Sequence, residues 1–164
     1  MMDFKLAIPL ALHQLASAIW IGGMFFAHVA LRPTLKTTLT PQARIEVALG
    51  VFRRFFPWVW VAIITLWASG FWIGIVTHAD KVGLHVHIMM GIALIMSLIF
   101  AYLYAFPYRM MVHLATGYEN WSWAGIKLSQ VRKLMFVNLV LGVTTIIVAA
   151  AGPAVFPAVQ SLTK

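Results

Sequence analysis

Four long apolar runs set what this chain can fold into. They cover residues 6–31, 57–77, 84–106 and 134–151. A helix needs about 20 apolar residues to cross the hydrocarbon core of a bilayer, and each run is near or above that length. Prolines follow three of the runs, at Pro33, Pro107 and Pro153. The sequence therefore predicts an all-α integral membrane protein, a single domain over residues 1–164 that forms an antiparallel four-helix bundle.

Charged side chains are too few to cover a water-facing surface. They make up 10% of the chain, whereas 62% is hydrophobic, and a soluble domain carries about 25% charged residues. The net charge is +8, and its Lys and Arg residues fall between the apolar runs. At that position they contact anionic lipid headgroups. We therefore expect the lipid bilayer as a partner and no binding of nucleic acid, which favours a basic stripe on a polar helix.

The first run contains Ala16-Ser17-Ala18, a sequence similar to a signal-peptide cleavage site. The apolar segment of a secretory signal is about 7–15 residues long. This run continues past the alanines to Leu31 and is longer than that. We therefore expect it to be retained as a membrane span.

Two of the connections contain amphipathic segments. Thr40-Pro41 is typical of a helix start, with an N-cap followed by Pro at the first helical position. The segment from there to Arg54, and a second one from Glu119 to Lys133, alternate charged with apolar residues. We predict that each forms a short helix lying along the membrane interface, in the first and third loops.

The basic residues predict how the bundle is oriented. Cytoplasmic loops of membrane proteins carry an excess of Lys and Arg. Nine of these residues fall in the first and third loops, and three fall on the other side, at Lys5, Lys81 and Lys164. We therefore expect both termini to face away from the cytoplasm, which in a bacterial inner membrane means the periplasm.

Histidines within the runs are the strongest functional candidates, because ionisable groups inside a membrane are costly. His13 lies about two turns inside the first run. It is either a ligand or a neutral ring hydrogen-bonded to a neighbouring helix, and we favour the ligand. His85 and His87 point about 200° apart on a helix, so only one faces the bundle interior. We expect His87, because Gly91 lies one turn further and leaves room beside it.

His28 and His113 fall at the opposite end of the bundle from His13. His13 and His28 are 15 residues apart and lie within about 60° of one face of an ideal α-helix. We favour a site formed by His13 and His87 over one formed by His28 and His113, because the last of these lies beyond Pro107 at the headgroups.

Two cofactors use imidazoles in an apolar bundle. Haem b takes two neutral imidazoles from different helices as axial ligands. Gly22, Gly23 and Gly91 would leave room for its flat ring. Copper(I) instead prefers soft ligands, and methionine thioethers with imidazole suit it. The alternative metal set combines His13 with residues near the start of the third run, namely His78, His85, His87, Met89 and Met90. The chain has no cysteine, so thiolate and iron–sulfur sites are excluded.

The remaining polar features favour packing roles. Gly70 and Gly74 form a GxxxG pattern, which permits close helix approach or a homodimer. Asn138 lies in the fourth run, where we expect a hydrogen bond to another helix. The acidic residues are Asp3, Glu46, Asp80 and Glu119, all outside the apolar runs. No carboxylate pair is present for hydrolysis or for a proton relay.

The opening helix resembles that of the CopD-type bacterial inner-membrane proteins, which are named after copper resistance. The likeness lies in His13, Trp20, Gly22-Gly23 and Leu31-Arg32-Pro33. Further segments that look like this family are 53–60, Ser69-Gly70, 85–91 and 138–142, so the resemblance covers nearly the whole chain.

The same helix is similar to that of HemJ-type protoporphyrinogen oxidases, where the matching histidine binds haem b. The resemblance implies that His13 is an axial ligand. The second ligand in that family is a lysine, and the third run here has none, so we assign the role to His87. The fourth run also lacks the family's acidic residue, and we do not expect porphyrinogen oxidation.

The leading hypothesis is therefore a haem b protein that acts in electron transfer, with quinone or another redox protein as partner. If it is an enzyme, it is a haem-dependent membrane oxidoreductase. The alternative is a copper-binding or copper-transporting membrane protein. A third hypothesis is a structural or assembly subunit whose histidines only form hydrogen bonds.

Overall fold

A computed structural model describes residues 4–76 and 83–155, with the side chains of 153–155 left out. These residues contain helices and no strand, which confirms the all-α fold class. The first helical stretch joins α1 (Phe4–Ser17), the π-helical turn η1 (Ala18–Gly22), α2 (Gly23–Phe26), a second π-helical turn η2 (Ala27–Leu31) and α3 (Arg32–Thr38). The others are α4 (Pro41–Val76), then α5 (Leu84–Leu103) with η4 (Tyr104–Tyr108) and α6 (Arg109–Thr116), and finally α7 (Trp121–Val155).

Four of these continuous stretches are long and apolar enough to cross a membrane, as predicted. They are Phe4–Thr38, Pro41–Val76, Leu84–Thr116 and Trp121–Gly152, with 35, 36, 33 and 32 residues. At 1.5 Å per residue each is longer than the roughly 30 Å of hydrocarbon that a span must cross. In a helix that crosses upright, the extra length would extend beyond the apolar core.

The two amphipathic segments are not separate helices. Residues 41–56 form the N-terminal part of α4, and residues 121–133 form that of α7, with no break before the apolar run. The buried face of the first segment carries Ile45, Ala48 and Phe52. This stripe packs into the bundle and continues the stripe of the span, so the helix has no reason to end between them.

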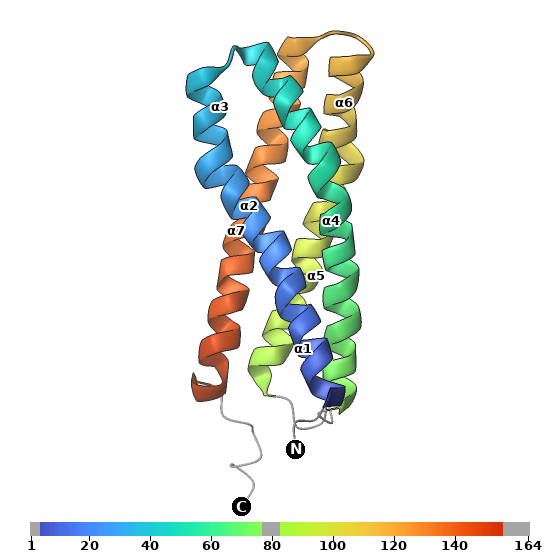
Figure 1. Ribbon diagram of the computed structural model, residues 1–164, viewed down its shortest axis with the longest axis vertical. Coiled ribbons are helices and arrows are strands. Elements are labelled where there is room, and N and C mark those ends of the chain that lie inside the picture. The colour runs from blue at the N-terminus through green and yellow to red at the C-terminus, as the bar shows by residue number, and fades with distance from the viewer. Residues whose placement is uncertain (1–3, 77–82, 156–164) are drawn as a thin grey trace, which may run out of the picture.

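The helices pack as two main pairs, α1 with α4 and α5 with α7, and α6 also contacts α7. Figure 1 shows the stretches side by side along the long axis of the molecule. The connections from α3 to α4 and from α6 to α7 lie at one end. The starts of α1 and α5 lie at the other end, with the ends of α4 and α7.

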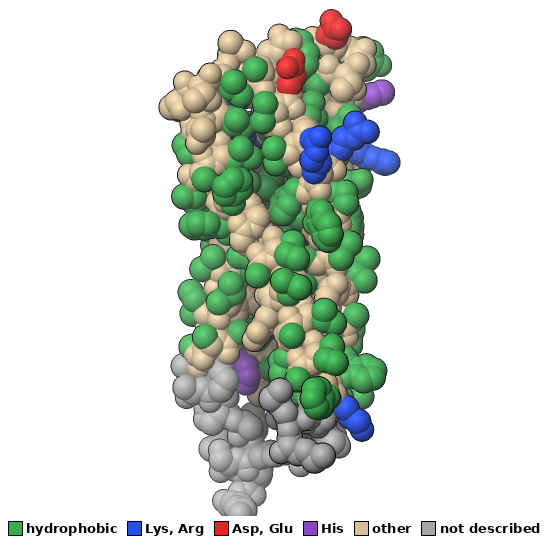
Figure 2. Space-filling model, viewed as in Figure 1, with side chains coloured by type: hydrophobic (Ala, Val, Ile, Leu, Met, Phe, Trp, Pro, Cys, Tyr) green, Lys and Arg blue, Asp and Glu red, His purple; other side chains and the backbone are tan. Residues whose placement is uncertain are grey.

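Aromatic rings fill the centre of the bundle. Phe56 is 1% exposed and packs edge-on against Phe100 and Tyr108, at ring-centroid distances of 5.4 and 4.8 Å. By contrast, many large apolar side chains point outward, among them Ile64, Ile75 and Leu98. Figure 2 shows hydrophobic side chains over the middle of the visible face, with the charged ones near its ends. This is the surface expected of a helix bundle whose solvent is lipid.

Candidate functional site

His13 is held by a hydrogen bond between helices. Its Nδ1 lies 2.9 Å from the Ser69 hydroxyl of α4. That hydroxyl has a single hydrogen, which it donates to the Thr65 carbonyl at 2.6 Å. With the hydroxyl hydrogen on the Thr65 carbonyl, Nδ1 carries the ring proton and Ser69 accepts it. In the neutral ring this leaves the lone pair on Nε2, the nitrogen that a metal would bind.

Gly70 lies beside His13 where α1 packs on α4. A Cβ added to it would lie 3.5 Å from the His13 Cε1 atom, in ordinary contact. A Cβ added to Gly74, the other end of the GxxxG pattern, would meet nothing within 4 Å. An alanine would therefore fit at either position within the chain, and the roles predicted for the GxxxG pattern stay predictions.

The structure corrects the choice between His85 and His87. His87 is exposed, and so is Gly91, which has nothing within 4 Å of an added Cβ. His85 is half-buried against Gly152 of α7, and its Nδ1 is buried without a hydrogen bond. The prediction that His87 faces the interior beside a roomy Gly91 is therefore wrong, because the buried stripe of α5 runs through His85.

The glycines of the first stretch do not form a cradle for a flat ring. Gly22 is exposed, with nothing within 4 Å of an added Cβ. A Cβ on Gly23 would overlap the ring of Phe55 from α4. Gly23 therefore provides the space for an aromatic side chain, and the prediction that it provides space for a porphyrin is wrong.

The expected copper ligands are only partly brought together. Met89 is half-buried one turn after His85, whereas Met90 is exposed. His78 lies outside the described residues. Among the residues that the structure describes, no three His, Asp or Glu side chains lie close enough to hold one metal ion.

The two histidines at the other end do not form a site either. His28 stacks on Phe136 at 5.0 Å, with its Nε2 3.4 Å from an Arg32 nitrogen. His113 packs edge-on against Tyr118. These two rings contact different aromatic partners. The predicted preference for a His13–His87 site over a His28–His113 site is not confirmed, because His87 is exposed.

Two buried side chains away from His13, Asn138 and Trp20, carry polar atoms inside the bundle. Asn138 is 1% exposed, and its Nδ2 donates to the Met96 carbonyl of α5 at 3.1 Å, which confirms the predicted hydrogen bond between helices. Its Oδ1 is buried without a partner, as is Nε1 of Trp20. Trp20 packs edge-on against Phe100, one turn beyond Met96. The sequence marks Asn138 as a polar group within an apolar run, whereas Trp20 enters there only through the resemblance of the opening helix.

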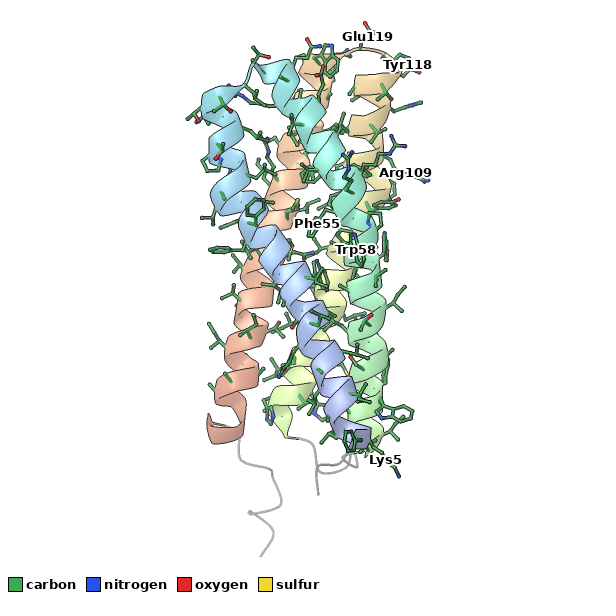
Figure 3. The ribbon with its side chains drawn as sticks, viewed as in Figure 1. Lys5, Phe55, Trp58, Arg109, Tyr118 and Glu119 are labelled. Atoms are coloured by element: carbon green, nitrogen blue, oxygen red, sulfur yellow. The ribbon has the colours of Figure 1, made fainter. Side chains whose placement is uncertain are left out.

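A cavity of about 920 Å³ lies away from His13. It is lined by residues of α4, η4, α6 and α7 and by Tyr102 near the end of α5. Figure 3 shows Arg109, one of its lining residues, toward the end of the molecule opposite Lys5.

Comparison with known proteins finds no relative of this chain: it matches no family model, no curated protein and no solved structure.

Proposed function

We propose that this protein is an antiparallel four-helix bundle of the bacterial inner membrane that binds haem b through His13 and takes part in electron transfer. The single observation that supports it is the hydrogen bond from His13 Nδ1 to Ser69. Histidines that bind metals usually donate their second ring N–H to a neighbouring acceptor, which fixes the tautomer and orients the free nitrogen.

The described residues offer one imidazole for the haem, from His13, whereas His87 is exposed and His85 packs against Gly152 of α7. The pairing of His13 with His87 is therefore not proposed again. A second ligand and part of the space for the ring would have to come from a second copy of the chain. Bound haem would supply one-electron redox chemistry, with quinone or another redox protein as partner. The chain's own part is to hold the His13 ring and to keep its proton on Nδ1.

The charge distribution supports the proposed orientation. Eight of the nine predicted cytoplasmic Lys and Arg residues lie in α3, α4 and α7, and the ninth is Arg109 of α6. Figure 1 shows α3, α6 and the starts of α4 and α7 at the same end of the bundle. An orientation with this end in the cytoplasm follows the positive-inside rule and places both termini in the periplasm.

The test is a visible spectrum of protein purified after expression with ample haem. We expect a Soret band in the wild-type protein and in His87→Ala, and none in His13→Ala. The haem content per chain then tells whether one haem is shared by two chains. A wild-type protein without a Soret band would refute the proposal, and equal loss in both variants would refute the assignment to His13.

A second candidate function, copper(I) handling, is favoured by one observation. Nδ1 of His85 is buried without a hydrogen bond, and the Met89 thioether lies one turn along the same face. Imidazole nitrogen and thioether sulfur are both ligands for Cu(I). Metal analysis of the protein after anaerobic loading with Cu(I) tests it. His85→Ala should lower the bound copper at least tenfold and the exposed control Met90→Leu should not.

A further inference from the structure

The cavity of about 920 Å³ has a strongly basic lining. Three cations from three helices line it: Arg53 of α4, Arg109 of α6 and Lys127 of α7. No Asp or Glu is among the lining residues. Figure 2 shows Lys and Arg side chains gathered over α4 and α6, with a histidine beside them and hydrophobic side chains below. We call this surface the basic groove.

The cations of the basic groove have no counter-ion in the described part of the chain. Arg53 and Arg109 make no ion pair there, and the Nζ of Lys127 donates only to the amide oxygen of Gln130, at 3.3 Å. The described acids are Glu46, which accepts from Gln42, and Glu119, which does not line the groove. Like charges gathered in one groove repel unless an anion sits between them. The groove is therefore complementary to a negatively charged group.

The backbone beside the groove is irregular. Five of the lining residues form the π-helical turn η4, Tyr104–Tyr108. Pro107 lies within it and has no N–H to donate to the preceding turn, which explains the widened hydrogen-bonding pattern. Turns of this type are frequent at functional sites, where they reorient side chains.

Apolar side chains continue the groove away from its cations. Tyr102 is 55% exposed and Phe106 is 63% exposed, and both belong to the lining. A small water-soluble anion would make no use of them. An amphiphile would place its charged head on the arginines and its chains along these rings, as aromatic residues do at membrane–water interfaces.

We propose that the basic groove is a binding site for an anionic phospholipid, whose phosphate lies between Arg53, Arg109 and Lys127. Arginine forms paired hydrogen bonds with phosphate oxygens, and lysine contributes a point charge. The inference does not depend on haem or copper, because His13 and His85 lie elsewhere in the bundle.

The experiment measures lipid retention by native mass spectrometry of the full-length protein, exchanged from detergent against phosphatidylglycerol or phosphatidylcholine. The groove variant carries Arg53→Gln, Arg109→Gln and Lys127→Gln. A matched control also replaces two arginines and one lysine, but at positions that do not line the groove: Arg32→Gln, Arg54→Gln and Lys133→Gln. We expect affinity for phosphatidylglycerol to fall about fivefold per groove cation and about a hundredfold in total. The control should stay within about fivefold of wild type.

Three results would overturn the site. The first is equal loss in both triple variants, which would mean general attraction to the positive end. The second is displacement of the lipid by inorganic phosphate at equal concentration, which would make phosphate alone the ligand. The third is a preference of the wild-type protein for phosphatidylglycerol over phosphatidylcholine of less than about threefold. This measurement uses no variant, so it tests the site even if the groove variant does not fold.

Discussion

Replacing Gly152 by alanine should destabilise the bundle by separating α5 from α7. The new Cβ would lie 2.5 Å from the Cβ of His85 and 2.7 Å from its Cγ. Carbon atoms in contact are about 3.5–4.0 Å apart, so the helices would have to separate by about 1 Å at this level. The His85 Cβ is fixed to the backbone and cannot move aside by changing rotamer. Overpacking of this kind costs about 1–3 kcal/mol, and the better helix propensity of alanine offsets up to about 1 kcal/mol of it.

The assay is reversible unfolding in mixed micelles of mild detergent and dodecyl sulfate, followed by tryptophan fluorescence. Gly91→Ala is the matched control, because Gly91 is exposed on α5 and an added Cβ meets nothing within 4 Å. It should be neutral or stabilising by up to about 1 kcal/mol. If Gly152→Ala unfolds at the same point as wild type, or if Gly91→Ala is the weaker of the two, the packing of α5 on α7 described above is wrong.

Three further substitutions separate packing from ligand binding. In a double-mutant cycle between His13→Ala and Ser69→Ala, the coupling energy should be about 0.6–1.7 kcal/mol, and a value near zero would deny the hydrogen bond. Asn138→Asp should destabilise the protein by about 2.5–3.5 kcal/mol, because it places a carboxylate in the apolar centre, and unchanged stability would show that the site is wet. Gly23→Ala should lower stability by about 1 kcal/mol, because the added Cβ overlaps the Phe55 ring, while Gly22→Ala should be neutral or stabilising by up to about 1 kcal/mol, which unfolding in micelles would detect. Equal effects on both would deny that the Phe55 ring fills the space at Gly23.

The four apolar helices could be predicted from the sequence because their signal is local. A run of about 20 residues with few or no charges is typical of a helix that crosses a membrane. The hydrogen bond of Asn138 to another helix followed from the same cost of polar groups in lipid. The start of α4 at Pro41 was also predicted, from Thr40-Pro41, and is confirmed. The expected break between each amphipathic segment and its span was wrong, because the segments of α4 and α7 continue into the spans as single helices. Hydropathy does not reveal that continuity.

The error over His87 reflects how uniformly apolar α5 is. Its buried residues include Met96, Phe100 and Leu103, spaced three or four apart. Extending that spacing backwards reaches Met89 and His85 and passes over His87, but the surrounding residues are apolar too, so the sequence does not single out this stripe. The role of Gly23, by contrast, depends on the ring of Phe55 from another helix, and no pattern within one segment reveals such a contact.

The π-helical turns have a consequence for how the chain tolerates changes in length. A wide turn takes up about one residue more than an α turn, and one residue corresponds to about 100° of rotation. The first helical stretch holds two such turns, η1 and η2, between His13 and Arg32, so the facing of its two halves is offset from that of an ideal helix. Deleting one residue from η4 would therefore restore α geometry and leave the facing of Arg109 and the residues after it nearly unchanged. The same deletion within the regular α-helix of α5 would rotate the residues that follow by about 100°. Each π-helical turn thus marks a position where the chain can lose one residue and keep the helix faces that follow in register.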